Sequence, residues 1–322
     1  INEALDLIKG GNWPNAANVN PSAFVDALFS TFVYDGTSDT SLAINNGLDL
    51  TKGGLVWTKE RTNNGGGNIL FSTDASGNHS GLLFSNTSAA AGSGYQPDYF
   101  TFRNNGYTTT NTVGDSKVNG REYVSWSFRK QPKFFDVVTY TGNGTSGRTV
   151  SHSLDSTPGM VIIKKTDSTK NWIVHHRSGT SGKYLILNST GDEASGSDIT
   201  ATSSTNITLS DSTTVNDSGG TYVAYLFAHN NNDGGFGEPG DQDIIKCGSY
   251  TGNAGNPQVI DVGFEPQFLM VKVASTSGDW QIVDNMRGVL PDGDYPCNNL
   301  YWNKTDAETL AGSFGFFANG FT

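Results

Sequence analysis

The side chains that most often carry catalysis or metal binding are sparse and scattered in this sequence. Its five histidines are spread along the chain, and the only adjacent pair is His175 and His176. Neighbouring side chains on a regular strand point to opposite faces, so this pair is poorly placed to hold one metal ion. The others are His79, His152 and His229. We interpret all five as ordinary polar residues and expect no metal centre built on histidine.

Glycoside hydrolysis would need two facing carboxylates, and no such pair is evident. On a strand, the two side chains would be spaced by two or four residues. The glutamates are isolated from one another. The sequence also contains no nucleophile elbow, phosphate-binding loop or dinucleotide fingerprint. We therefore expect a protein that is not an enzyme, with no catalytic residues and no cofactor.

Two acidic clusters lie in turns rich in Gly and Pro, where calcium binding is one chemistry that they could support. Hard cations favour loop carboxylates and carbonyls. Asp, Gly and Pro are also the residues that tight turns require, and the spacing does not match a helix–loop–helix calcium loop. Turn formation is the favoured interpretation, with calcium as the alternative. The clusters are Glu238, Asp241 and Asp243, and Asp292 with Asp294.

Aromatic side chains exposed in loops would offer platforms for sugar rings. Four tyrosines fall in predicted loops and are the ligand-binding candidates: Tyr95, Tyr99, Tyr107 and Tyr295. Three tryptophans fall instead within predicted strands, where packing in the core is the favoured interpretation. These are Trp57, Trp172 and Trp280.

The elements that would position these residues recur three times along the chain. The motif Tyr140-Thr141-Gly142-Asn143 returns as Tyr250-Thr251-Gly252-Asn253 and, more weakly, as Tyr34-Asp35-Gly36. Three further landmarks follow each motif in one order, which chance would not preserve. They are an apolar run ending in Lys (55–59, 160–164, 268–272), a second short run (68–71, 171–174, 279–283) and a third run closing on Asn (82–86, 185–188, 300–303).

The last strand of the repeat is present in two copies only. It lies at residues 122–128 in the first copy and 221–227 in the second, whereas the third copy reaches Thr322 without it. Because an unpaired sheet edge tends to recruit another strand, we expect either that the polypeptide continues or that a neighbouring chain supplies this strand.

These patterns predict an all-β protein of tandem antiparallel β-sandwich modules, of jelly-roll or lectin-like type. Short β-branched and aromatic runs bounded by Gly, Asn and Pro are typical of strands. Runs such as 160–163 are apolar throughout and suit the centre of a two-layer sandwich. We expect the modules to be joined like beads by short linkers. The expected modules span 32–131, 132–229 and 244–322, the last incomplete at its C-terminal end, with a linker at 230–243.

Residues 1–31 belong to no copy of the repeat. We expect a docking or linking arm here, partly helical, because residues 3–9 have the pattern of one or two amphipathic helical turns that end at Gly10 and Gly11. A loosely packed terminal arm is the alternative. The chain does not begin with Met and shows no signal peptide, so we expect a processed chain or a fragment.

The bulk composition excludes two classes of partner. The formal net charge is −11, and the 20 Lys and Arg residues form no run, so a nucleic-acid footprint is missing. No stretch approaches the roughly 18 apolar residues of a membrane span, so we expect no membrane insertion. Cys247 and Cys297 are the only cysteines, and their spacing leaves both a disulfide and two separate buried thiols open.

The repeat resembles a known module. Its signature here is Tyr-Thr-Gly-Asn-Gly at 140–144, His-Ser-Leu-Asp-Ser-Thr-Pro at 152–158, Asn171-Trp172 and Thr-Tyr-Val-Ala-Tyr at 221–225. This combination resembles a repeated module of virion structural proteins of marine tailed phages, including cyanophages, and is similar in outline to concanavalin-A-like lectin sandwiches. The resemblance covers nearly all of residues 32–322 and carries no catalytic motif.

The resemblance implies an extracellular protein of the virion surface, such as a tail fibre or a capsid decoration. Its expected partners are other virion proteins and copies of itself, as a trimer or higher oligomer, with host-surface glycan as a second contact. Weak glycan binding would gain strength from multiple copies. The alternative is a cell-surface or secreted bacterial adhesin built from the same modules. A polysaccharide-degrading enzyme is the third class, and it would need the paired carboxylates that the sequence does not show.

Overall fold

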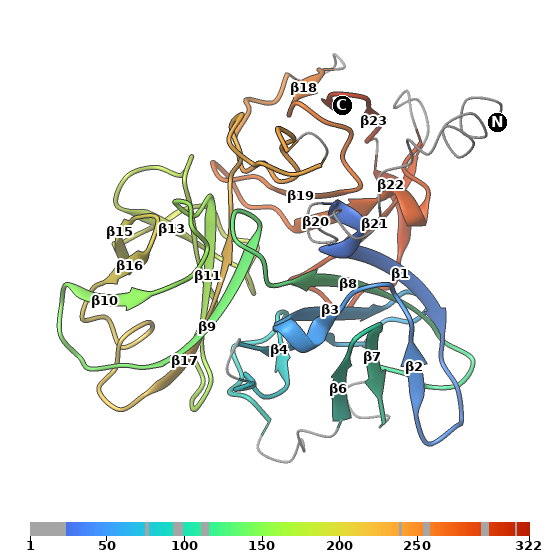
Figure 1. Cartoon of the computed structure of the whole chain (residues 1–322), viewed down its shortest axis with the longest axis horizontal. Helices are drawn as coiled ribbons and strands as arrows, with labels where there is room; N and C mark the ends of the chain where they lie inside the picture. Colours follow the sequence, from blue (N-terminus) through green and yellow to red (C-terminus); the bar gives the residue numbers. More distant parts are fainter. Residues whose placement is uncertain are drawn as a thin grey trace, which may run out of the picture.

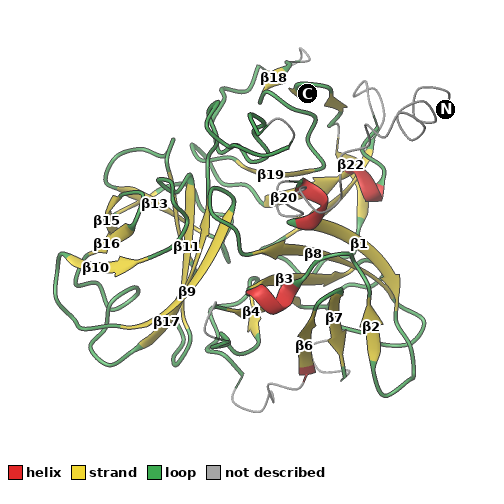
Figure 2. Cartoon of the chain, in the orientation of Figure 1, coloured by secondary structure: helices red, strands yellow, loops and turns green. Residues whose placement is uncertain are grey.

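The computed structural model describes residues 24–74, 77–92, 99–110, 116–237, 240–253, 258–290, 296–312 and 314–322. The fold is all-β, as predicted, and its strands form several antiparallel sheets (Figure 2). The helical elements in these ranges are single 3-10 turns at Val25–Ala27, Leu50–Lys52 and Asn285–Arg287. None of the helices described is long and apolar enough to span a membrane.

The first part of the chain, which we call module 1, contains two sheets. The three-stranded sheet has the order β2 (Leu42–Ile44), β7 (Gly106–Thr109) and β6 (Phe100–Arg103). The five-stranded sheet has the order β1 (Phe29–Asp35), β8 (Glu122–Arg129), β3 (Gly54–Glu60), β4 (Asn68–Thr73) and β5 (Leu83–Phe84). Strand β1 begins inside the predicted N-terminal arm, because Leu28 and Phe29 are apolar enough to be buried. The predicted helical turns at 3–9 lie outside the described residues.

Module 2 repeats this two-sheet arrangement. Its small sheet has the order β10 (Arg148–Ser151), β16 (Asn206–Leu209) and β15 (Ile199–Thr202). Its large sheet has the order β9 (Phe135–Thr141), β17 (Thr221–Phe227), β11 (Met160–Lys165), β12 (Ile173–His176), β13 (Lys183–Ile186) and β14 (Ala194–Ser195).

Module 3 has the same plan with a shorter large sheet. That sheet has the order β19 (Phe268–Lys272), β20 (Trp280–Asp284), β21 (Cys297–Tyr301) and β22 (Thr309–Gly312). The small sheet has the order β18 (Ile260–Asp261), β24 (Gly320–Phe321) and β23 (Phe316–Phe317). All three predicted runs ending in Lys are therefore strands: they lie in β3, β11 and β19.

Each module buries apolar side chains between its own two sheets, as a sandwich does. Ile163 and Leu226 lie in this layer of module 2, and Val56 and Phe71 lie in the equivalent layer of module 1. In module 3 the layer is smaller and is centred on Val283 and Phe316.

The other face of every large sheet is also apolar, and all three faces meet in one shared core. On β8 the inward residues are Val124, Trp126 and Phe128, and on β17 they alternate in the same way. Figure 1 shows the three modules as lobes around this centre. The expectation of modules joined like beads is therefore wrong, because each large sheet is covered on both faces.

Phe128 shows how closely the modules interpenetrate. Its ring lies 5.3 Å from the ring of Phe227 in module 2 and 6.1 Å from that of Phe268 in module 3. Trp57 and Trp302 stack at a centroid distance of 3.5 Å across the boundary between modules 1 and 3. The predicted core role of Trp57, Trp172 and Trp280 is confirmed, since all three lie in the shared core.

The described residues of the predicted linker at 230–243, which are 230–237 and 240–243, are part of the packed structure. Asn230 is 1% exposed, and its amide donates to the Lys133 carbonyl at 2.9 Å. Its Oδ1 accepts from the backbone N–H groups of Ile244 and Ile245. Phe236 belongs to the shared core. The Asn- and Gly-rich composition of this segment therefore serves turns and buried hydrogen bonds, not a flexible spacer.

The recurring Asn of the repeat has one role in all three modules. Its side-chain oxygen accepts a backbone N–H from the first or second residue of the second run, which fixes the turn that follows the third run. The pairs are Asn86 with Asn68 at 3.1 Å, Asn188 with Trp172 at 3.0 Å, and Asn303 with Trp280 at 2.9 Å.

The turn after each recurring Asn forms the seam with the next module. In each module, the residue two positions after the recurring Asn accepts, through its carbonyl, a backbone N–H from the next module. Written as donor to acceptor, these bonds are Lys170 to Ser88 at 3.0 Å, Gly278 to Thr190 at 2.8 Å, and Gly65 to Thr305 at 3.0 Å. The residue five positions after the Asn donates its backbone N–H to a carbonyl of the same neighbouring module. These bonds are Ala91 to Thr166 at 2.8 Å, Glu193 to Ala274 at 3.1 Å, and Glu308 to Arg61 at 2.8 Å. Module 2 joins module 1, module 3 joins module 2, and module 1 joins module 3, so the ring is closed.

The recurring Lys reaches across the same seams. Lys59 Nζ donates to the Lys304 carbonyl at 3.0 Å, and Lys164 Nζ donates to the Ser88 carbonyl at 3.1 Å. Lys272 Nζ lies 3.4 Å from the Thr190 carbonyl. Burial lowers the pKa of both Lys59 and Lys164 to about 8 and also lowers the pKa of Lys272. The three lysines thus occupy equivalent positions in one closed arrangement.

Because the pKa of the buried Lys59 and Lys164 is lowered, we expect the free energy of unfolding to rise between about pH 8 and pH 10. Their pKa in the folded chain lies below the ordinary value of 10.5, so the unfolded chain binds more protons in this window. The free energy of unfolding then rises with pH, by up to about 1.4 kcal/mol per pH unit for each lysine. Above pH 10 the buried tyrosines reverse the trend, because burial raises the pKa of Tyr225 to about 12.

Urea denaturation at half-unit pH intervals measures this slope. The double variant Lys59→Met/Lys164→Met should lose it, whereas Lys183→Met, at an exposed position of β13, should keep it. A slope that is unchanged in the double variant would contradict the assignment.

Candidate functional site

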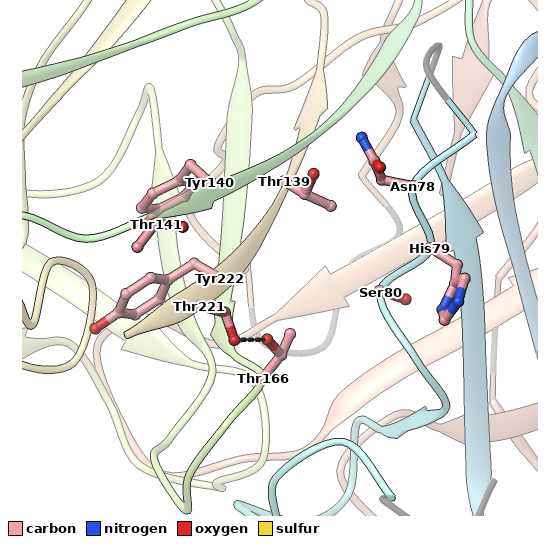
Figure 3. Close-up of a pocket in the computed structure, with 9 residues that line it drawn as sticks. All are labelled: Asn78, His79, Ser80, Thr139, Tyr140, Thr141, Thr166, Thr221 and Tyr222. Atoms are coloured by element: carbon pink, nitrogen blue, oxygen red, sulfur yellow. Dashed lines mark hydrogen bonds between the residues drawn. The ribbon is translucent and has the colours of Figure 1, made fainter. Parts of the chain in front are cut away.

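A groove of about 470 Å³ lies at the seam between modules 1 and 2 (Figure 3). One wall is the loop that follows β4, and the other is the edge formed by β9 and β17. The residues that line it carry hydroxyl, amide or imidazole groups, and none is Asp, Glu, Lys or Arg. They are Asn78, His79, Ser80, Thr139, Tyr140, Thr141, Thr166, Thr221 and Tyr222.

Asp74 holds the first wall in place against the second. Its carboxylate accepts from the backbone N–H and the side-chain amide of Asn78, both at 3.0 Å. The same carboxylate accepts the Thr139 hydroxyl from β9 at 2.9 Å. The loop and the edge strand are therefore joined by one carboxylate.

The imidazole of His79 is the most exposed ring in the groove. His79 is an exposed residue, and its ring stacks on Phe71 at a centroid distance of 6.1 Å. Its Nδ1 accepts the Gly81 N–H at 3.3 Å, which in the neutral ring places the proton on Nε2. A proton on Nε2 can be donated to a ligand oxygen.

The second wall is rigid because the hydroxyls of its two tyrosine rings are hydrogen-bonded to backbone carbonyls. Tyr140 and Tyr222 stack at 5.0 Å with an angle of 11°. Their hydroxyls donate to the carbonyls of Val215 at 2.7 Å and Thr213 at 3.0 Å. Burial raises the pKa of both phenols, and that of Tyr140 is well above its ordinary range. These tyrosines are neutral structural supports.

Threonine hydroxyls supply the polar surface of this wall. Thr141 and Thr221 are exposed at the ends of paired strands, and the Thr221 hydroxyl shares a hydrogen bond of 2.7 Å with Thr166. Hydroxyl groups both donate and accept. Together with Asn78 and His79 they can pair with the hydroxyls of a neutral ligand, whereas no carboxylate pair is present for acid–base chemistry in the groove.

Neither Tyr99 nor Tyr107, the two of the four predicted ligand-binding tyrosines that the structure describes, lines this groove. Tyr107 lies in β7 and is 0% exposed, because it faces the core of module 1 and not solvent. Tyr99 is half-buried and packs against the same core. Tyr95 and Tyr295 lie outside the described residues. For Tyr107, the prediction of an exposed loop aromatic is therefore wrong.

In the acidic cluster around residue 243, the Asp243 carboxylate stabilises a turn by accepting backbone N–H groups. The Asp243 carboxylate accepts the N–H groups of Asn232 at 2.8 Å and Gly234 at 3.0 Å. Asp241 is exposed nearby in sequence. Glu238, Asp292 and Asp294 lie outside the described residues, so their assignment as calcium candidates stays a prediction. Within the ranges that the structure covers, no group of three His, Cys, Asp or Glu residues could hold a metal ion.

The histidine pair and the cysteines have local roles. His175 and His176 alternate on β12, and burial lowers the pKa of His176 to about 4. Cys247 and Cys297 are separate thiols, which decides between the two alternatives that their spacing left open. Burial raises the pKa of the Cys247 thiol to about 12, which makes it a poor nucleophile.

Comparison with known families places nearly the whole chain in one of them. The model of DUF7483, described as a domain of unknown function, matches residues 21–322. No curated protein and no solved structure gives a significant match. The match begins before β1 and runs through β24, so it takes in all three modules and the groove between the first two. The chain therefore belongs to the DUF7483 family.

Proposed function

We propose that this chain is a non-enzymatic structural protein of a virion surface or appendage, and that it contacts neutral glycans through the groove between modules 1 and 2. The placement in a virion rests on the resemblance of the repeat to phage structural modules. The glycan contact rests on one observation: every residue that lines the groove is uncharged or an imidazole, and most carry a hydroxyl.

The chemistry of the groove suits a sugar better than an ionic ligand. Sugar hydroxyls pair with groups that both donate and accept, which Thr141, Thr221 and the amide of Asn78 provide. An anion or cation would find no opposite charge among the lining residues. The groove is open to solvent, so each site binds weakly. Several copies on one particle would raise the avidity.

The internally closed ring supports the structural part of the proposal. Three seams of backbone hydrogen bonds and one shared core give a rigid unit without a second chain. Such a unit can be displayed on a particle with its groove held in a fixed orientation. Assembly with other virion proteins and with further copies of the chain belongs to the same proposal.

A glycan array followed by titration calorimetry tests the groove. We expect binding to neutral oligosaccharides with dissociation constants of about 1 mM, which corresponds to about −4 kcal/mol. The double variant His79→Ala/Thr141→Ala should weaken binding by about tenfold, because it removes two exposed polar groups of the groove. Thr149→Ala on β10 is the matched control, since Thr149 is equally exposed but lies outside the groove. Binding that is equal in all three proteins would refute the glycan site.

Immunogold labelling tests the location independently. Antibodies raised against the chain should decorate intact phage particles. Label confined to a bacterial envelope would favour the adhesin instead, and would leave the glycan result unaffected.

A further inference from the structure

Six Asn-Gly pairs occur in the chain, and this dipeptide is chemically suited to spontaneous deamidation. Glycine has no side chain to shield its backbone nitrogen, so that nitrogen can approach the side-chain carbonyl carbon of the preceding asparagine. In a folded protein, the reaction depends on how firmly the structure holds these two groups. The pairs begin at Asn46, Asn64, Asn105, Asn119, Asn143 and Asn319.

In four of these pairs, hydrogen bonds hold both the asparagine Oδ1 and the glycine N–H. Asn64 Oδ1 accepts the Ala307 N–H at 2.8 Å, and the Gly65 N–H donates to the Thr305 carbonyl at 3.0 Å. These bonds must break before the two groups can react, which slows the reaction. Written as donor to acceptor, the corresponding bonds are Leu48 to Asn46 and Gly47 to Asn105, Gly47 to Asn105 and Gly106 to Leu48, and Thr145 to Asn143 and Gly144 to Asn216.

Strand pairing and close packing hold the pair that begins at Asn319. Gly320 lies in β24, opposite Asp261 of β18 and Phe317 of β23. Gly320 is buried, and a Cβ added to it would lie 2.0 Å from the carbonyl oxygen of Ile260. The backbone around Gly320 therefore leaves little room for the Asn319 side chain to fold onto its nitrogen.

The pair Asn119–Gly120 is held by none of these restraints. It forms the turn that leads into β8, in which the Arg121 N–H donates to the Val118 carbonyl at 3.2 Å. Asn119 and Gly120 are both exposed, and a Cβ added to Gly120 would meet nothing within 4 Å. In the part of the chain that the structure describes, neither the Asn119 side chain nor the Gly120 N–H forms a hydrogen bond.

We propose that Asn119–Gly120 is a modification site, at which the folded chain deamidates spontaneously. The Gly120 nitrogen loses its proton and attacks Asn119 Cγ, which forms a new C–N bond and a cyclic succinimide. The bond between Cγ and the side-chain nitrogen breaks, and ammonia leaves. Solvent water then opens the ring at either of its carbonyls, so that aspartate or isoaspartate replaces asparagine. Each event consumes water and releases ammonia. This inference does not depend on the proposed function.

Modification at this position would alter a charged corner of module 1. The product carries a new negative charge, and isoaspartate also lengthens the main chain directly before Arg121. The Arg121 guanidinium lies 2.8 Å from the carboxylate of Glu60, whose side chain is fully buried. Moving this cation away would leave a buried carboxylate with weaker compensation, which destabilises the fold.

The corresponding turn of module 2 supplies a matched control, because it has the same conformation without the amide. Ser218 stands there in the place of Asn119, and Gly219 stands in the place of Gly120. The two glycines have φ angles of 80° and 79°, and the Gly220 N–H closes the turn as the Arg121 N–H does. Asn119→Ser should therefore keep the turn and remove the reacting group.

Peptide mapping by mass spectrometry tests the site after incubation of the full chain in mildly alkaline buffer, which favours loss of the nitrogen's proton. Each deamidation replaces –NH2 with –OH, so its extent can be measured separately at every Asn-Gly pair. In the folded chain, Asn119 should react faster than every other Asn-Gly asparagine by about tenfold or more, because no hydrogen bond has to open first. In concentrated urea, all the pairs lose their restraints, so their rates should converge.

The Asn119→Ser variant should lose the fast reaction and leave the rates at the other Asn-Gly pairs unchanged. The proposal would be overturned if another pair reacted as fast as Asn119 in the folded chain. It would also be overturned if Asn119 kept its lead in urea, because the local sequence and not the fold would then set the rate.

Discussion

Replacing Arg287 with Met lowers the expected free energy of unfolding by about 3–5 kcal/mol, because it leaves a buried carboxylate without its cation. Asp284 and Arg287 are both fully buried at the side chain and lie 2.7 Å apart. The Asp284 carboxylate also accepts the indole N–H of Trp126 at 3.0 Å, and the guanidinium lies 5.4 Å from the Trp126 ring centre. This ion pair therefore joins module 3 to module 1.

A double-mutant cycle separates loss of the pair from loss of packing. Asp284→Asn combined with Arg287→Met removes both charges of the pair, so the double variant should be more stable than the Arg287→Met single variant. Urea unfolding gives each free energy. Additive effects of the two substitutions would contradict the coupling, as would a loss below about 1 kcal/mol in the single variant.

Replacing Trp302 with Ala has a comparable expected cost of about 3–5 kcal/mol. Trp302 is 1% exposed in the shared core, where its ring stacks on Trp57 and meets the edge of Trp126 at 6.2 Å. A cavity here removes contacts with modules 1 and 3 together. Amide exchange should therefore accelerate in both modules, including β3 and β8.

Trp302→Phe is the informative control for this cavity. The Trp302 indole nitrogen has no hydrogen-bond partner within the described structure, so the phenyl ring loses area but no bond. Its cost should be less than half that of Trp302→Ala in the same urea titration. Equal costs for the two variants would show that stacking on Trp57 contributes little.

The repeat itself could be predicted from sequence because its landmarks have local physical causes. Branched and aromatic runs between Gly and Asn form strands whatever lies beyond them. This is why the runs in β3, β11 and β19 were visible. The function of the recurring Lys was not visible, since it reaches a turn of another module that only the closed ring brings near. The recurring Asn acts within its own module, on a residue that the pairing of two strands brings near.

The shared core was missed for a reason that Met160–Lys165 illustrates. This strand is buried along its whole length. A two-layer sandwich needs one apolar face, so a strand that is apolar on both faces indicates cover on both sides. The sequence therefore carries the signal, although an apolar run alone also suits the centre of a two-layer sandwich. The buried role of Asn230 and Phe236 was hidden by a composition typical of linkers.

The groove was beyond sequence reasoning for a different reason. Its walls come from loop residues near 78 and strand residues near 140 and 221, which no local pattern connects. The candidates chosen from sequence were aromatic, and Tyr107 proved to be a core residue. Apart from His79 and two tyrosines, the residues that line the groove are Thr, Asn and Ser, which are common throughout this chain and therefore carry no signal of their own.

The closed ring with one shared core is tested most directly by native-state hydrogen exchange over a denaturant series. The slowest amides of β3, β11 and β20 should converge on one opening free energy and one denaturant dependence, since the three modules unfold together. Three separate opening free energies, each with the smaller denaturant dependence of a single module, would show that the modules unfold independently and would contradict the ring.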